Sequence, residues 1–264
     1  VTASSFSGDG TGLTGVAGTE NIRTNTNATF LQNINVGVAI TAGKLGIGFT
    51  DANVKVGNTA LDSQTTGNYN TAVGNQSLTA NTSGSNNTAV GNESLDANTT
   101  GSTNTAVGAA ALGANTTGAE NTAVGANALD ASTTGNNNTA VGRNALGANT
   151  TAGSNTSIGA YSLSLNTTGG DNTACGRSAL QNNTTGATNT SVGYNSLQNN
   201  TTASNNVAVG YVALQSNTTG TQNTALGSGC LTANTTADEN TAVGYLALND
   251  NTTGALNTAV GAYC

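Results

Sequence analysis

Glycine recurs every 17 residues from Gly74 to Gly261 without an insertion or deletion, and most neighbouring positions repeat with it. One repeat reads Asn-Thr-Ala-Val-Gly-x-x-(Ala/Ser)-Leu-x-x-Asn-Thr-Thr-Gly-x-x, and its positions are numbered here from 1 to 17, starting at the first asparagine. Leucine stands at position 9 in every repeat from Leu78 to Leu248. A short fixed period of this kind is typical of solenoids, in which each unit packs on its neighbours.

The residue types of the repeat favour strands over helices. Thr, Asn, Val and Gly are poor helix formers, whereas Thr and Val suit a pleated sheet. We therefore predict an all-β parallel β-solenoid with 17 residues per turn. Positions 1–4 should form a strand with Thr and Val on one face and Ala on the other, and positions 7–9 should form a second strand. Leu, Val and Ala should fill the core.

The two glycine positions predict the corners of the coil, because glycine adopts positive φ freely. Position 5 admits no other residue, so it should require glycine. Position 15 accepts Ala152, Ala203 and Ala237, so that corner should not require it.

Like residues stack on like residues in such a coil, with turns about 4.8 Å apart. The asparagines at position 1 (residues 70, 87, 104 and onward) and at position 12 (residues 81, 98, 115 and onward) are candidates for ladders of amide hydrogen bonds. The alternative interpretation is that these asparagines serve only as turn formers.

A single thin coil buries little apolar surface per turn, so we expect coils to associate side by side, most simply as a parallel homotrimeric fibre. The repeats should occupy residues 53–264, beginning with a degenerate unit in which Val54 and Lys55 replace Thr and Ala. Residues 1–52 should form a β-rich connector with a hairpin. The array stops at Cys264 within a repeat and without a polar cap, so we expect more chain or another protein beyond it.

Composition argues against several classes of function. The net charge of −7 and five scattered basic residues disfavour nucleic acid as a partner. No apolar run approaches the roughly 20 residues that span a bilayer, so membrane insertion is not expected. Without histidine, Ser-His-Asp and Cys-His catalysis and His-containing metal sites are excluded. We expect no enzyme activity, catalytic residue, cofactor or metal.

Positions 6 and 7 vary most between repeats, and a fibre would present contacts there. Candidate surface contacts are Tyr161, Tyr194, Tyr211 and Tyr245, because tyrosine is common in binding surfaces. The alternative is that these tyrosines only decorate the surface or pack between chains. Cys175, Cys230 and Cys264 are expected to behave as small buried apolar residues without intrachain disulfides.

The repeat Asn-Thr-Ala-Val-Gly-x-x-Ala-Leu with its trailing Asn-Thr-Thr-Gly resembles repeats of phage tail fibres and bacterial surface proteins that end in an endosialidase-type intramolecular chaperone. Residues 3–16 resemble segments common in the same proteins. A looser similarity exists to the heads of trimeric autotransporter adhesins, whose core reads Val-Ala-Ile-Gly. The resemblance implies an extracellular, trimeric, β-rich fibre that holds a binding end away from a virion or a cell.

The first functional hypothesis is therefore a structural extracellular fibre shaft, on a virion tail or a cell surface, that contributes to attachment through a cell-surface glycan or protein. The second is a self-polymerising extracellular filament or functional amyloid, favoured by the Asn ladders and the uncapped end. The third is an ice-binding protein, since a rank of threonines runs from Thr71 to Thr258 with Val207 as its one exception. Ice binding usually needs two parallel Thr ranks on one flat face, a T-x-T pattern that this repeat does not supply.

Overall fold

A computed structural model describes residues 52–64 and 66–264, and these residues contain 13 parallel strands and no helix. The predicted connector and hairpin in residues 1–52 lie outside this part of the chain, apart from Ala52. The strands are β1 (Val54–Val56), β2 (Thr71–Val73), β3 (Thr88–Val90), β4 (Thr105–Val107), β5 (Thr122–Val124), β6 (Thr139–Val141), β7 (Thr156–Ile158), β8 (Thr173–Cys175), β9 (Thr190–Val192), β10 (Val207–Val209), β11 (Thr224–Leu226), β12 (Thr241–Val243) and β13 (Thr258–Val260).

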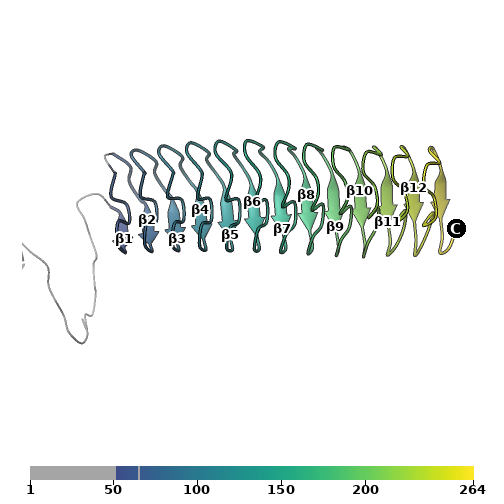
Figure 1. The fold of residues 1–264 in the computed structure, drawn as a ribbon, viewed down its shortest axis with the longest axis horizontal. Coiled ribbons are helices and arrows are strands. Elements are labelled where there is room, and N and C mark those ends of the chain that lie inside the picture. Colours follow the sequence, from purple (N-terminus) through teal and green to yellow (C-terminus); the bar gives the residue numbers. More distant parts are fainter. Residues whose placement is uncertain (1–51, 65) are drawn as a thin grey trace, which may run out of the picture. The chain divides into compact units, whose positions relative to one another are not determined.

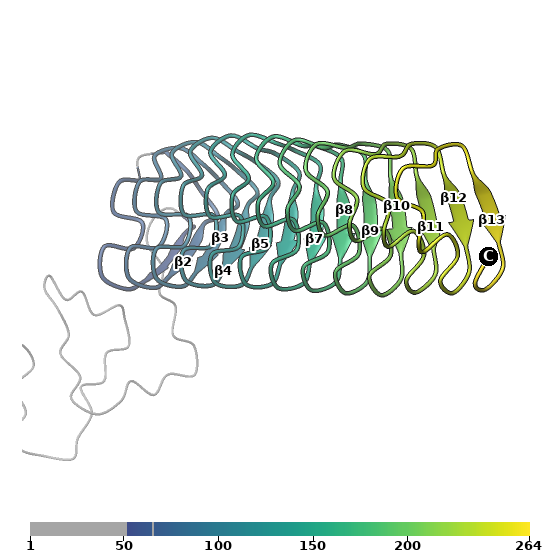
Figure 2. The same cartoon turned by 45° about the vertical axis from the view of Figure 1, so that its right-hand side comes forward.

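The strands stack in sequence order into one sheet, β1 to β13, along the axis of a coil (Figures 1 and 2). Each strand pairs with the residues 17 positions further on, so that Thr88 lies beside Thr105 and Ala89 beside Ala106. One repeat therefore makes one turn of a β-solenoid, as the period predicts. At about 4.8 Å per turn, twelve such steps extend roughly 58 Å.

Alternate residues of each strand point to opposite sides of the sheet. The central alanine is fully buried, as at Ala106, while the flanking threonine and valine lie on the outer face. This division confirms the predicted alternation, but the prediction that valine fills the core is wrong. Val124 is 37% exposed, and the core consists mainly of the alanines at positions 3 and 8 and the leucines at position 9.

The predicted second strand at positions 7–9 is also wrong, because this segment is a series of turns. Residues at positions 7 and 9 adopt the left-handed conformation, as in Glu93 (φ 55°) and Leu95 (φ 51°). Two such residues bend the chain around the buried leucine. Backbone hydrogen bonds to adjacent turns hold the bend: the Leu95 N–H donates to the Ala111 carbonyl (3.0 Å), and the Glu93 N–H donates to the Asn75 carbonyl (3.0 Å).

The two glycine corners differ as expected. At position 5, Gly91 has a φ of 139°, a conformation that residues with a Cβ rarely adopt, so this corner requires glycine. The glycines at position 15 have no positive φ among the described residues. Ala152 takes that position with its carbonyl still accepting amide protons from Asn138 (2.9 Å) and Asn149 (3.1 Å).

Position 1 forms an unbroken asparagine ladder inside the coil. From Asn53 to Asn223, each side chain accepts a hydrogen bond from the backbone N–H of the next turn's asparagine and donates one to the glycine or alanine carbonyl at position 15. Asn87, for example, accepts from Asn104 (2.9 Å) and donates to Gly101 (2.9 Å). The ladder runs from Asn53 to Asn257. These asparagines are therefore ladder residues that also stabilise a corner, and the interpretation that they serve only as turn formers is wrong.

Position 12 forms a second ladder, in which the amide donates along the axis and to the same position-15 carbonyl. Asn98 donates to Asn81 (2.9 Å) and to Gly101 (3.0 Å). This ladder is interrupted at Ser132, which has no amide to offer. As a result the Oδ1 atom of Asn115 and the hydroxyl of Ser132 are buried without a hydrogen-bond partner.

The first turn departs from the pattern where the sequence does. Lys55 stands at position 3, where all later turns have Ala or Ser, and its ammonium lies 3.0 Å from the carboxylate of Asp62 in the same turn. β1 still pairs in register with β2, so the described residues of this repeat continue the coil.

Candidate functional site

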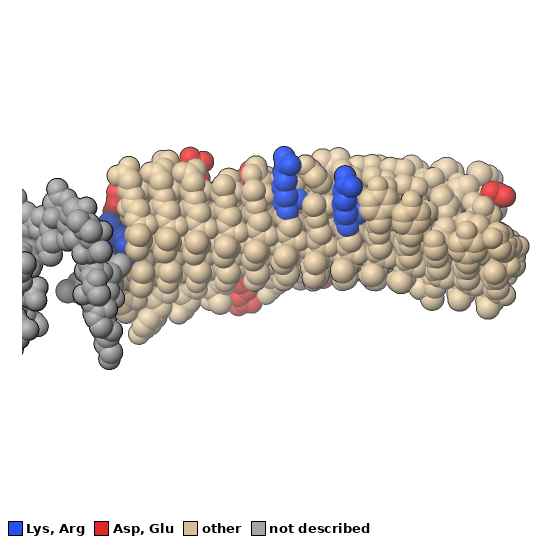
Figure 3. All heavy atoms as spheres, turned by 90° about the horizontal axis from the view of Figure 1, so that it is seen from below, with Lys and Arg blue, Asp and Glu red and all other residues tan. Residues whose placement is uncertain are grey.

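The variable positions 6, 7, 10 and 11 follow the position-5 corner and its turns, and their side chains lie on the outside of the coil. Because the backbone of each turn is held by its neighbours, these side chains can change without altering the frame. Figure 3 shows one face of the coil, where two basic side chains lie near one another among few charges. Arg143 and Arg177, both at position 6, are separated by two turns and are the only arginines among the described residues.

The structure brings the predicted tyrosines together with each other and with the arginines. Tyr194 and Tyr211 stack with ring centroids 5.6 Å apart and an interplanar angle of 11°. Arg177 lies 5.9 Å from the Tyr194 centroid, which extends the stack by one turn. Parallel stacking and cation–π contact both follow from the short axial step between turns.

The other two tyrosines belong to separate pairs. Arg143 lies 5.6 Å from the ring centroid of Tyr161, and Tyr245 meets Tyr263 edge to face at 5.2 Å. Tyr245 is 50% exposed. The sequence placed these residues at variable positions but gave no signal for their partners, since position 6 of one turn contacts position 7 of the next.

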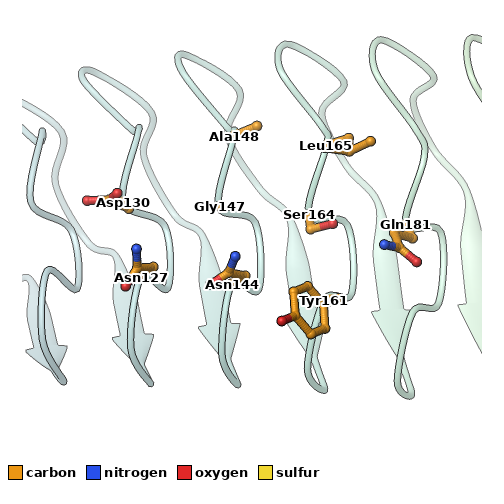
Figure 4. Close-up of a pocket in the computed structure, with 9 residues that line it drawn as sticks. All are labelled: Asn127, Asp130, Asn144, Gly147, Ala148, Tyr161, Ser164, Leu165 and Gln181. Carbon is orange, nitrogen blue, oxygen red and sulfur yellow. The ribbon is translucent and has the colours of Figure 1, made fainter.

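An open hollow of about 420 Å³ lies beside Tyr161, on the turns of β5 to β8 (Figure 4). The hollow exists because Gly147 and Ala148 leave little side chain at positions 10 and 11 of one turn, while Tyr161 and Leu165 rise on the next. Its lining residues are Asn127, Asp130, Asn144, Gly147, Ala148, Tyr161, Ser164, Leu165 and Gln181. Of these, only Tyr161 was expected from the sequence to form a contact site.

Two carboxylates at position 10 have raised pKa values. Burial is the main cause of the raised pKa of Asp130, and repulsion from Glu93 adds to it. The pKa of Asp96 is raised for the same reasons, with a further contribution from Asp130. Gly113 lies between the two aspartates and contributes no side chain to separate them. This side of the coil is therefore acidic and partly desolvated.

The cysteines do not all behave as predicted. Cys230 is buried, and burial raises the pKa of its thiol to about 11, so it is a poor nucleophile at neutral pH. Cys175 and Cys264 are exposed, which corrects the expectation of burial. Cys175 is exposed because it replaces the outward valine of β8. The described residues contain no disulfide.

Residues 52–64 and 66–264 contain no group of three His, Cys, Asp or Glu side chains arranged to hold a metal ion. Within the same ranges, there is no helix long and apolar enough to cross a membrane. Comparison with models of protein families, with curated proteins and with solved structures finds no significant match to this chain.

Proposed function

We propose that this chain is the shaft of an extracellular fibre, on a virion tail or a cell surface, with attachment as a second role. The observation that supports this best is the uninterrupted in-register stack of 13 strands. Each internal turn is hydrogen-bonded to the turn before it and the turn after it. Such a thin coil spans a long distance with few residues. A spacer needs this property, and an active-site scaffold does not.

The outer face of the sheet supports side-by-side association. From β2 to β13 its outward residues are Thr, Val, Ile, Cys and Leu, without a charge. Parallel sheets are normally covered on both faces. A strip of roughly 58 by 10 Å gives about 580 Å² per chain and about 1,160 Å² for a pair, close to the ~1,200 Å² at the lower end of stable interfaces. We therefore place the proposed homotrimer contacts on this face.

Light scattering and cysteine chemistry test the proposal together. Coupled chromatography and multi-angle scattering should give three times the chain mass of 25.6 kDa. Mild oxidation should link chains through Cys175, which lies on the proposed contact face, and a Cys175→Ser variant should lose that link while Cys264→Ser retains it. A monomer mass at micromolar concentration would remove the trimer, and a trimer without Cys175 links would move its interface elsewhere.

The self-polymerising filament is the competing function, and the first turn argues against it. A second copy stacked end to end on the β1 turn would cover the Lys55–Asp62 pair, which is now 36% and 45% exposed. Burying such a pair costs desolvation that the new contacts would have to offset. Purified chain should therefore not elongate into fibres, and electron microscopy of concentrated samples would reveal elongation if it occurs.

Ice binding has a weaker basis in the structure. The outer face of the sheet carries threonine at position 2 but Val, Ile, Cys or Leu at position 4 from β2 onward, so this face has a single Thr rank and no T-x-T pattern. We expect no thermal hysteresis from the purified chain.

A further inference from the structure

The hollow beside Tyr161 combines features that occur nowhere else together on the variable positions of the described turns. Position 11 holds Leu165, which is 49% exposed, whereas the same position elsewhere is Ala, Ser, Asn or Asp. One turn earlier, Gly147 removes the side chain that would cover the space in front of Leu165. Tyr161 and Leu165 stand on the same turn and both line the hollow, at its two ends and with Ser164 between them (Figure 4).

Polar groups on the neighbouring turns surround the side chains of Tyr161 and Leu165. Asn127 and Asp130 come from the turn of β5, Asn144 from that of β6, and Gln181 from that of β8. Ser164 adds a hydroxyl next to Leu165. The amides both donate and accept hydrogen bonds, and a carboxylate accepts them, so the set can satisfy several hydroxyl groups at once.

We propose that this hollow binds a neutral pyranose unit of a glycan. A pyranose has an apolar C–H face, which suits the Tyr161 ring and Leu165, and a rim of hydroxyls, which suits Asp130 and the surrounding amides. The volume of about 420 Å³ falls within the usual range for small-ligand sites, about 300–1,000 Å³. Asp130 lines the hollow and Arg143 lies 5.6 Å from the Tyr161 ring centroid, so opposite charges flank the site and favour a neutral sugar.

The site is open, so a single unit should bind weakly, with a Kd on the order of 1 mM. Three copies on one fibre would raise the apparent affinity for a surface that presents many sugars. This inference deepens the attachment role in the proposed function. It remains measurable on the isolated chain, whatever its oligomeric state.

Gly147 provides a variant that fills the hollow without straining the backbone. A Cβ at Gly147 would lie no closer than 3.4 Å to its neighbours, and glutamine already occupies position 10 in Gln181 and the two turns after it. Gly147→Gln should therefore fold normally and occlude the site. Thr232→Gln introduces the same residue at the same position five turns away and is the control, although it also removes the hydroxyl bond to the Gly229 carbonyl (2.7 Å).

The experiment is saturation-transfer NMR with the methyl glycosides of glucose, galactose and N-acetylglucosamine, each at about 10 mM so that a Kd near 1 mM gives strong occupancy. At least one glycoside should bind to the unmodified chain and equally to Thr232→Gln. Binding should fall at least about tenfold in Gly147→Gln and in Tyr161→Ala, but not in Val212→Ala, which changes position 7 three turns away. The melting temperatures of Gly147→Gln and Thr232→Gln should equal that of the unmodified chain.

Failure of all three glycosides to bind would overturn the assignment, and so would equal binding by Gly147→Gln. Either result with a trimeric mass would leave the proposed shaft intact. A monomeric chain that binds through this hollow would do the opposite, supporting the site and removing the trimer.

Discussion

The constant and the variable positions of each turn are built on different principles. A residue at a constant position contacts the same position in the turns before and after. Its type is repeated because each copy must fit the copy beside it. Gly91 faces Gly108 and Asn87 bonds to Asn104 in this way. Variable positions project outward from the same backbone and carry the stacked tyrosines and the hollow. The difference shows that the contacts between turns and the side chains that vary stand at separate positions of the repeat, and substitutions can test how complete that separation is.

The largest expected effect comes from adding a methyl group at a constant glycine. Gly142→Ala would place its Cβ 2.7 Å from the Gly159 carbonyl at a φ of 134°, so we expect a loss of about 3 kcal/mol or more in unfolding free energy. Gly147→Ala is the control at a variable position, where the nearest atom is 3.4 Å away, and it should change stability by less than about 0.5 kcal/mol. If urea unfolding shows equal losses of unfolding free energy for Gly142→Ala and Gly147→Ala, the distinction between constant and variable positions is wrong.

The next effect comes from breaking the unbroken ladder. Asn104→Ala removes the bond to the Gly118 carbonyl (2.8 Å) and the acceptor for the Asn121 backbone N–H (3.0 Å), both buried. The Gly118 carbonyl keeps the amide of Asn115 (3.0 Å), but the buried Asn121 N–H is left without an acceptor, which should cost about 1–3 kcal/mol. Asn92→Ala removes a more exposed amide contact with Asn75 (3.1 Å) at a variable position and should cost under about 0.5 kcal/mol. Chemical denaturation of both variants measures the difference.

A stabilising change should follow from repairing the broken ladder. Ser132→Asn would restore a donor for the orphaned Asn115 Oδ1 and an acceptor for the Asn149 amide, so we expect a gain of about 1–2 kcal/mol. The melting temperature of the variant checks this. An unchanged or lower value would mean that the axial amide bonds contribute nothing net.

The smallest effect concerns pH. The pKa of Asp130 is raised above its ordinary value of 3.8 by burial and by Glu93, so the folded chain holds this proton more tightly than the unfolded chain. The stability that Asp130 contributes is full below pH 3.8 and declines as the pH rises through the raised pKa. Asp130→Asn should therefore flatten the fall in melting temperature above pH 4, and Asp238→Asn on an exposed corner serves as the comparison. If the melting temperature of Asp130→Asn falls more steeply with pH than that of the unmodified chain, the predicted contribution of Asp130 has the wrong sign.

The sequence predicts the constant positions well, because the period itself encodes their contacts. Glycine at position 5 and asparagine at position 1 stack on their equivalents, so their roles follow once one repeat is assigned to one turn. The leucine at position 9 is different. Its left-handed backbone is unfavourable for leucine, so residue preferences predict a strand where Leu95 forms a turn. The outward direction of valine was missed because the short core has room only for alanine and leucine.

The candidate site was predicted only in part, for a related reason. Variability identified Tyr161, Tyr194, Tyr211 and Tyr245 but not their partners. Contacts between different positions of successive turns, such as Arg143 with Tyr161, depend on side-chain direction and not on the period. The hollow depends on a missing side chain at Gly147, and a glycine outside the two corner positions gives no signal of that kind in one sequence.

Distances between spin labels test the central claim that each repeat is one turn stacked in register on the last. Position 14 is exposed in Thr100, Thr168, Thr185, Thr202 and Thr219, so cysteine substitutions there can carry labels after the native cysteines are replaced. Measured from Thr100, pulsed electron resonance should give separations of about 19, 24, 29 and 34 Å, rising about 4.8 Å for each repeat. Separations that do not increase in equal steps with repeat number would contradict the account.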